Sequence, residues 1–114
     1  MGTLNYQPLS HYRVMWIFVM FDLPTHTKKH RQNYTQFRNY LLDSGYSQVQ
    51  YSVYLRHAPS REVMENYIAQ LKKRLPPAGY VNVIPITDKQ YTGIYSFRGE
   101  REEKMPENAQ LSLF

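Results

Sequence analysis

The sequence contains no cysteine among its 114 residues. This absence excludes a disulfide-based scaffold, a thiolate nucleophile and a cysteine-ligated zinc site, and it is typical of proteins kept in a reducing cytosol. No secretory signal pattern begins the chain, and the longest apolar run, Val14 to Phe21, is far too short to span a bilayer. We therefore expect a cytoplasmic protein that has no membrane partner.

Acidic residues are also scarce, above all in the first third of the chain. Fourteen Lys and Arg residues against nine Asp and Glu residues give a formal net charge of +5, and Asp22 is the only acid between Met1 and Leu42. A basic balance favours polyanionic partners. The chain also lacks a glycine-rich phosphate loop and a Ser-His-Asp arrangement, so nothing points to a P-loop nucleotidase or a serine hydrolase.

Hydrophobic patterning predicts the elements of the first half. Residues 14–21 are β-branched, aromatic and continuously apolar, which predicts a strand buried on both faces. A helix is expected to follow, begun by Thr25 or Thr27 and ended by Gly45. Its expected core positions are Tyr34, Phe37 and Leu41.

The middle of the chain changes from a period of two to a helical period. Residues 49–56 alternate between apolar and polar side chains, which predicts one strand, or two short strands with a kink near Gln50. Ser60 is expected to begin a second helix, and Pro76-Pro77 to end it. Its expected core positions are Val63, Tyr67, Ile68, Leu71 and Leu75.

Two further strands are predicted at residues 80–86 and 91–97, joined by a turn at residues 87–90. The resulting order is β-α-β-β-α-β with an extra C-terminal strand and an apolar tail. This is the ferredoxin-like α+β arrangement, in which two helices cover one face of an antiparallel sheet. The expected segments are a leader at residues 1–13, a ferredoxin-like domain at residues 14–98, and a charged linker with an apolar tail at residues 99–114.

The first strand has an implication for assembly. It is apolar on both faces, whereas this fold supplies helices for only one of them. Another surface must therefore cover the second face, and a second copy of the chain is the simplest candidate. We expect a symmetric homodimer.

Asp22 stands where the buried first strand ends. A carboxylate at this position provides the hard oxygen ligand that Mg²⁺ prefers, and a two-fold dimer would bring two copies of it together. Two facing carboxylates repel each other and recruit a cation. The alternative is that Asp22 caps the following turn or helix through backbone amides, which is the commoner role of Asp at such a position. The residues alone leave both interpretations open.

Four cations and no acid lie in the predicted first helix: Lys28, Lys29, Arg31 and Arg38. Contacts to the phosphate backbone provide most of the sequence-independent affinity for nucleic acid, so phosphate binding is the functional interpretation. A solvated helix face is the alternative.

Histidines and tyrosines give weaker signals. His26 and His30 share a helix face, but without an H-E-x-x-H motif we do not expect zinc. Tyr34, Tyr51 and Tyr67 fall on expected core faces, so we interpret them as packing residues rather than base-stacking residues.

Several segments together resemble the small CRISPR-associated Cas2 family. Residues 15–31 (MWIFVMFDLPTHTKKHR) resemble its first strand, terminal aspartate and basic helix start, and residues 45–56 (GYSQVQYSVYLR) resemble its Gln-x-Ser-Val-aromatic strand. Residues 75–91 (LPPAGYVNVIPITDKQY) and the terminal QLSLF are similar to the variant found beside large single-effector nuclease systems. The ordered set extends over residues 14–114.

The resemblance implies a ferredoxin-like homodimer in which Asp22 holds a divalent metal, expected to be Mg²⁺, between the protomers. It also implies metal-dependent endonuclease activity on RNA or DNA. Asp22 and Tyr54, the aromatic residue of the strand motif, are then the expected catalytic residues. Members of the family act in spacer acquisition as the subunit that bridges integrase units and binds double-stranded pre-spacer DNA.

Three functions follow for comparison. The first is an architectural adaptor for an integrase, docked through Leu111, Leu113 and Phe114 of the apolar tail. The second is a metal-dependent phosphodiesterase in which Lys29 or Arg31 stabilises developing charge. The third is a non-catalytic ferredoxin-like module for nucleic-acid binding or regulation, although the aromatic signature of an RNA-recognition sheet is missing.

Overall fold

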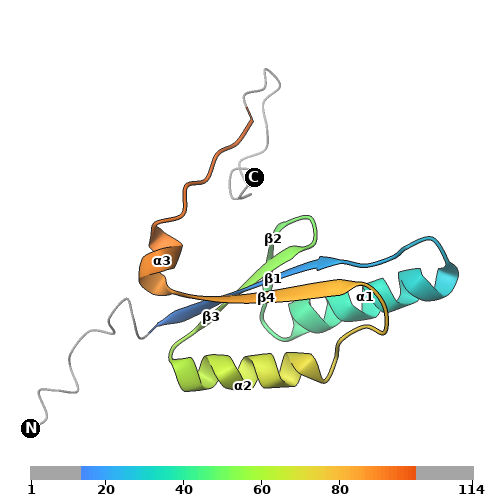
Figure 1. The fold of residues 1–114 in the computed structure, drawn as a ribbon, viewed down its shortest axis with the longest axis horizontal. Coiled ribbons are helices and arrows are strands. Elements are labelled where there is room, and N and C mark those ends of the chain that lie inside the picture. Colours follow the sequence, from blue (N-terminus) through green and yellow to red (C-terminus); the bar gives the residue numbers. More distant parts are fainter. Residues whose placement is uncertain (1–13, 100–114) are drawn as a thin grey trace, which may run out of the picture.

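A four-stranded antiparallel sheet with two helices on one face forms the domain in the computed structural model, which describes residues 14–99 (Figure 1). The strands are β1 (Met15–Asp22), β2 (Ser47–Gln50), β3 (Val53–Ala58) and β4 (Tyr80–Thr87), in the spatial order β2-β3-β1-β4. The helices are α1 (Lys28–Asp43), α2 (Arg61–Lys72) and the short α3 (Asp88–Thr92). The order β1-α1-β2-β3-α2-β4 confirms the predicted ferredoxin-like arrangement. No helix between residues 14 and 99 has the length and hydropathy of a membrane span.

Local sequence signals set the ends of both long helices. The Thr27 side chain begins α1 by accepting a hydrogen bond from the His30 backbone N–H at 3.0 Å. Gly45 follows the end of α1 with a φ of 104°, a conformation that favours glycine. The Ser60 hydroxyl begins α2 by accepting from the Val63 N–H at 3.1 Å. The expected helix starts and the Gly45 terminator are therefore confirmed, with Thr27 rather than Thr25 as the cap.

The core lies between the sheet and the two long helices. Its buried members include Met15, Ile17, Val19 and Phe21 of β1, Phe37 and Leu41 of α1, and Met64 and Leu71 of α2. Leu75 was wrongly expected to belong to it. This side chain is 46 % exposed because α2 ends at Lys72, before the helical period can carry Leu75 back to the sheet.

The β2–β3 hairpin confirms the two predicted short strands but corrects the position of one tyrosine. A register shift between Gln48 and Gln50 marks a β-bulge, and Ser52 adopts a left-handed φ of 60°. Tyr51 lies in the turn between β2 and β3 and is 78 % exposed, whereas Tyr54 of β3 is fully buried. The expectation that Tyr51 packs in the core was therefore wrong.

The predicted extra strand at residues 91–97 is not formed, and the predicted turn at residues 87–90 is the start of α3. Thr87 and Gln90 form a reciprocal capping box: each side chain accepts a hydrogen bond from the other residue's backbone N–H. Tyr91 then stacks on Trp16 at 4.1 Å. These local contacts favour a helical turn, whereas a strand needs a neighbouring edge, and no strand within residues 14–99 lies beside this segment.

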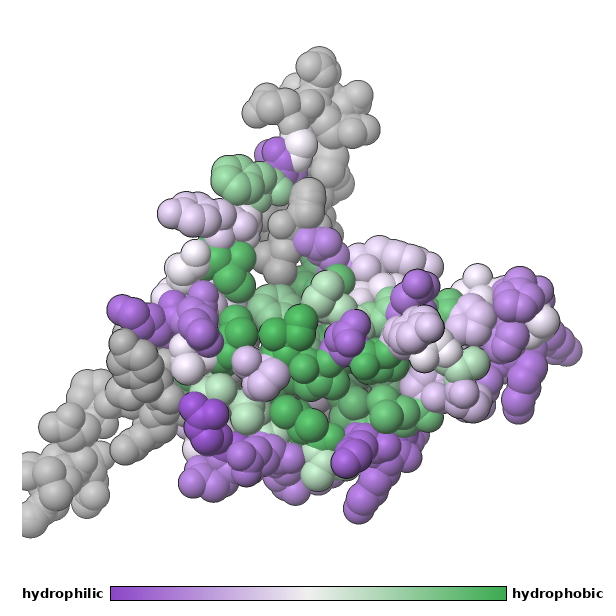
Figure 2. All heavy atoms as spheres, viewed as in Figure 1, coloured by the Kyte–Doolittle hydropathy of each residue, from purple (hydrophilic) through white to green (hydrophobic). Residues whose placement is uncertain are grey.

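The second face of the sheet is covered by neither long helix, and we call it the open face. Trp16, Phe18 and Met20 of β1 lie on it with their cross-strand neighbours Leu55, Ile84 and Ile86. Met20 and Ile84 are each 40 % exposed. Figure 2 shows hydrophobic residues gathered over the middle of the domain and hydrophilic residues over the start of α1. The expectation that β1 is apolar on both faces is confirmed, and the homodimer remains a prediction.

The predicted leader (1–13) and almost all of the predicted linker and tail lie outside the described residues, so these boundaries remain predictions.

Candidate active site

Asp22 is the last residue of the central strand β1, and its side chain is exposed on the open face. On one side its Cα partner is Tyr80, the first residue of β4. On the other side the β2–β3 turn approaches, because the Phe21 N–H donates to the Ser52 carbonyl at 3.1 Å. The carboxylate therefore stands at the end of a rigid, doubly paired strand.

The alternative role of Asp22 as a helix cap is not realised. Thr27 caps α1, and the Asp22 carboxylate has no hydrogen-bond or ion-pair partner within residues 14–99. An exposed carboxylate without a local partner is available for an external ligand.

A single chain offers only part of a metal site. No group of three or more His, Cys, Asp or Glu side chains that could hold a metal ion occurs in the described part of the chain. Mg²⁺ typically takes one or two carboxylates and completes its octahedral shell with waters and substrate phosphates. Asp22 therefore fits this ion as one half of a site that two chains share.

The cations nearest to Asp22 in the chain begin α1. Lys28 and Lys29 occupy its first turn, which contains no acid. The helix N-terminus carries a partial positive charge, so two lysines there are unfavourable until an anion binds. The Arg31 Nη1 atom donates to the Thr25 carbonyl at 3.0 Å, so this guanidinium folds back onto the loop that connects Asp22 to α1.

The four predicted phosphate-binding cations do not form one cluster. Lys28 and Arg31, together with the polar side chains of Gln32, Thr35 and Gln36, line a shallow hollow on the outer face of α1. Lys29 is exposed beside it, but Arg38 is half-buried and faces the Tyr54 hydroxyl. The structure thus brings Lys28 and Arg31 together and separates Arg38 from them.

Tyr54 lies in the core rather than on the surface. It is fully buried, and its ring stacks on Phe21 with centroids 5.6 Å apart. Burial raises the pKa of Tyr54, an effect that the neighbouring Arg38 guanidinium partly opposes. The ring therefore supports the residue that precedes Asp22 from beneath.

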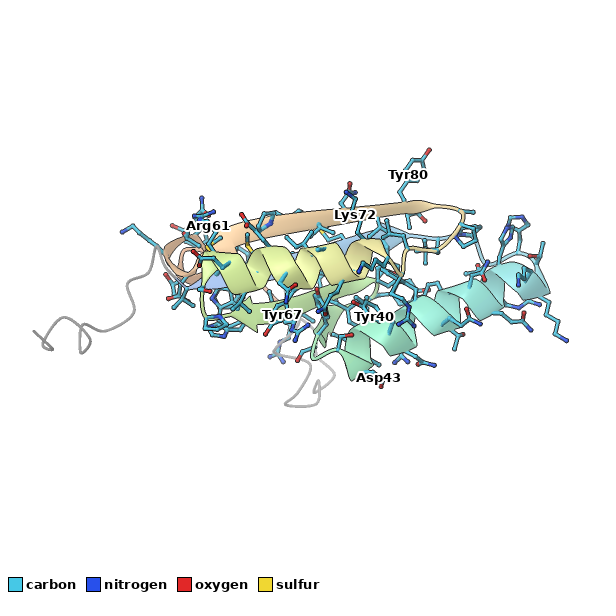
Figure 3. All side chains as sticks on the ribbon, turned by 90° about the horizontal axis from the view of Figure 1, so that it is seen from below. Tyr40, Asp43, Arg61, Tyr67, Lys72 and Tyr80 are labelled. Carbon is cyan, nitrogen blue, oxygen red and sulfur yellow. The ribbon has the colours of Figure 1, made fainter. Side chains whose placement is uncertain are left out.

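Two exposed tyrosines in the segments next to the end of β1 were not predicted as functional residues. Tyr51 is 78 % exposed in the β2–β3 turn, and Tyr80 is 75 % exposed at the start of β4. Figure 3 shows Tyr80 pointing away from α1 and α2. Gly79, directly before Tyr80, signals a tight turn in the sequence, whereas the predicted kink near Gln50 did not reveal that Tyr51 lies in a turn.

The prediction that His26 and His30 share a helix face was wrong, because α1 begins at Lys28 and His26 lies before it. The rings of His26 and His30 lie 4.6 Å apart, and the His30 Nδ1 atom is shielded without a hydrogen-bond partner in the described range. With no third ligand beside them, the pair does not form a metal site.

A second group of aromatic and cationic side chains lies on the helix side of the sheet. The Arg56 guanidinium stacks over Tyr67 at 3.4 Å and approaches Tyr46 at 5.4 Å, and Arg74 lies over Tyr40 at 4.6 Å (Tyr40 and Tyr67 are labelled in Figure 3). Burial raises the pKa of Tyr46 to about 12, and the Arg56 charge partly opposes the rise. These contacts join α1 and α2 to the sheet, so we assign them to packing.

Comparison with known proteins identifies the family. The family model described as CRISPR associated protein Cas2 matches residues 15–94. A protein of Flavobacterium psychrophilum named CRISPR-associated endoribonuclease Cas2 is 41 % identical over 111 residues, which cover 96 % of each chain. Proteins of the same name from Paracidovorax avenae and Parvibaculum lavamentivorans are 43 % and 40 % identical, over 93 % and 88 % of this chain and 99 % and 100 % of their own.

Proposed function

Because this chain belongs to the CRISPR-associated Cas2 family, we propose that it is a metal-dependent endoribonuclease that works as a homodimer, with Asp22 as its central catalytic residue. The observation that carries the proposal is the exposed Asp22 carboxylate at the end of a buried central strand, which has no hydrogen-bond or ion-pair partner among residues 14–99. Carboxylates placed in this way are candidates for metal or proton chemistry rather than for stability.

Dimerisation is supported by the open face. It presents Met20 and Ile84, each 40 % exposed, around the half-buried Trp16 and Ile86. Burying this surface against a second copy would stabilise the dimer by roughly 25 cal/mol for each Å² of apolar surface removed from water. Since Asp22 lies on the same face, a two-fold axis across it would bring two Asp22 side chains toward each other.

The two Asp22 carboxylates would together hold one Mg²⁺, whose remaining positions suit waters and phosphate oxygens. When bound, the ion would polarise a phosphoryl oxygen and lower the pKa of a coordinated water. The side chains of this chain have simpler tasks. Lys28, Lys29 and Arg31 attract and hold the phosphate backbone, and Arg38 and Tyr54 support the strand end from within the fold.

Cleavage of RNA in Mg²⁺ by the parent chain and by Asp22→Asn tests this function. Asp43→Asn, which alters the exposed acid at the end of α1, is the matched control. We expect at least a hundredfold loss in Asp22→Asn and no loss in the control, because one interaction made only in the transition state is worth several kcal/mol. Equal rates for parent and Asp22→Asn would contradict the proposal and indicate a contaminating nuclease.

Sedimentation of the Met20→Glu and Ile84→Glu variants tests the dimer. A charge on the open face would be desolvated at the seam, so both variants should be monomers at concentrations where the parent is a dimer. Ile94→Glu, at a residue that is 38 % exposed and lies after α3, should not change the assembly. A monomeric parent would contradict the shared metal site.

We also propose that the dimer bridges two integrase units in the cytoplasm and binds double-stranded pre-spacer DNA through its basic helices. The apolar tail residues Leu111, Leu113 and Phe114, which follow a charged segment, support docking to that partner. They lie outside the described residues. A chain ending at Ala109 should lose co-purification with the integrase, and retention would exclude docking through the tail.

A further inference from the structure

The two most conspicuous exposed rings near Asp22 have no role in the core. Tyr51 and Tyr80 are 78 % and 75 % exposed, so neither contributes much buried area to folding. They lie on the two sides of β1, because β3 and β4 are the neighbours of β1 in the sheet and each tyrosine stands at the Asp22 end of its hairpin or strand.

The position of Tyr51 is fixed although its ring is open. The next residue, Ser52, has a φ of 60°, its carbonyl accepts from the Phe21 N–H at 3.1 Å, and its hydroxyl lies 3.4 Å from the Tyr34 hydroxyl. A side-chain hydrogen bond with Tyr34 raises the pKa of Tyr51. The turn that carries Tyr51 is therefore anchored to β1 and lies against α1, while the ring itself remains exposed.

The position of Tyr80 is fixed by a close backbone approach. Gly79 has a φ of 96°, and a Cβ atom there would lie 2.7 Å from the Asp22 carbonyl oxygen. Cross-strand partners share a face of a sheet with Cβ atoms about 5 Å apart, so Tyr80 stands beside the Asp22 side chain.

Rigid, exposed tyrosines are well suited to stacking on nucleobases. Such stacking is worth about 1–3 kcal/mol per base and tolerates any base, because every base has a flat π-face. A ring carried on an anchored backbone segment loses less conformational entropy on binding than one carried on a free segment.

We propose that Tyr51 and Tyr80 stack on bases on the two sides of Asp22 and so position the nucleic-acid strand at the metal-binding carboxylate. The inference rests on the proposed function, because it assigns these residues to the same site. Both tyrosines are positioning residues. The site would then contact the bases of the strand as well as its phosphates.

Binding to two matched ligands tests the proposal. The first is a short oligoribonucleotide, and the second is the same oligomer with every base replaced by an abasic residue. Measured by fluorescence anisotropy in the Asp22→Asn background, which prevents turnover, Tyr51→Ala and Tyr80→Ala should each weaken RNA binding by about five- to a hundredfold. Their affinity for the abasic oligomer should stay within about twofold of that of the unsubstituted background, since it contains no base to stack.

Three variants complete the design. Tyr51→Phe and Tyr80→Phe retain the ring and should keep RNA affinity near the background value. Tyr95→Ala removes a tyrosine that is 85 % exposed after α3, beyond the opposite end of β1, and should change neither affinity. Because all three tyrosines are exposed, thermal unfolding should be nearly the same for every variant.

The result that would overturn the inference is unchanged RNA affinity in both alanine variants, or an equal loss for RNA and for the abasic oligomer. Either result leaves the nuclease proposal standing if Asp22→Asn still abolishes cleavage. Conversely, base-dependent loss in the tyrosine variants together with full cleavage by Asp22→Asn would uphold stacking and reject Asp22 catalysis.

Discussion

The two ends of β1 differ on the open face: one end is covered by α3, and the other is exposed. At the first end, the Trp16 indole N–H donates to the Asp88 carboxylate at 2.7 Å, and Tyr91 stacks on the same indole at 4.1 Å. At the other end, Asp22 and its neighbour Tyr80 are exposed. α3 thus closes one end, while no element among residues 14–99 closes the other.

The difference separates stability from function along a single strand. Side chains at the closed end satisfy one another, so they contribute to the free energy of unfolding. Side chains at the open end have polar atoms and ring faces that contact solvent, so they are free to contact a ligand. Substitutions at the first end should therefore lower stability, and substitutions at the Asp22 end should lower function.

Truncating one aromatic residue at each end should give the largest contrast. Trp16→Ala removes a half-buried indole with its stack and its hydrogen bond, and we expect it to cost about 3 kcal/mol of unfolding free energy. Tyr80→Ala should cost less than about 0.5 kcal/mol, because its ring is exposed. Urea denaturation measures both values. Similar losses of unfolding free energy in the two variants would show that both ends contribute equally to stability.

A methyl group at Gly79 should disturb the open end through the backbone. Gly79→Ala places a Cβ atom 2.7 Å from the Asp22 carbonyl oxygen at a φ of 96°, so we expect a cost of about 2 kcal/mol and slower RNA cleavage. The matched control is Gly93→Ala, where the nearest atom is 3.5 Å from the added Cβ and φ is −90°. That change should be nearly neutral. An unaffected cleavage rate in Gly79→Ala would show that the spacing of Asp22 and β4 is unimportant.

Removing only the indole hydrogen bond at the closed end should have a smaller effect. Trp16→Phe keeps an aromatic ring against Tyr91 but no longer donates to Asp88, so we expect about 1 kcal/mol of destabilisation. RNA cleavage at the far end should be unchanged. Loss of cleavage at full stability would mean that the two ends are coupled.

Raising the pH should lower the stability of the whole domain, and so should not distinguish the two ends of β1. Folding raises the pKa of Tyr46 from its ordinary value of 10.0 to about 12, so the folded state holds this proton more tightly than the unfolded state. Stability therefore falls as the pH rises from 10 toward 12, by an amount that solvent screening keeps to about 1 kcal/mol. Tyr46→Phe should reduce this slope in urea titrations, and Tyr54, whose pKa is also raised by burial, should contribute to the remainder. An identical slope in the variant would assign the effect to another group.

The sequence predicted the parts of the fold that depend on local signals. Thr27, Gly45 and Ser60 mark helix ends through contacts within a few residues, and the apolar run of β1 marks the central strand. The sequence predicted a kink near Gln50, but the exact bulge between Gln48 and Gln50 depends on the pairing of β2 with β3. The helical turn of α3 depends in part on Trp16, which is 72 residues away from its partner Asp88.

The candidate site was predicted to a similar extent. Asp22 could be identified because a lone acid at the end of an apolar run is conspicuous, and Lys28 and Arg31 because the following helix lacks acids. Tyr51 was assigned to the core because strict alternation was assumed across the turn between β2 and β3. Tyr80 gave no signal, since its proximity to Asp22 is created by the pairing of β1 with β4.

The stoichiometry of divalent-cation binding is the most direct test of a metal site that two chains share. Mn²⁺ is a suitable substitute for Mg²⁺ because it prefers the same oxygen ligands and can be followed by electron paramagnetic resonance. We predict one bound ion per pair of chains for the parent dimer, and none for Asp22→Asn. One ion per chain, or equal binding by the two proteins, would contradict a site that two Asp22 carboxylates share.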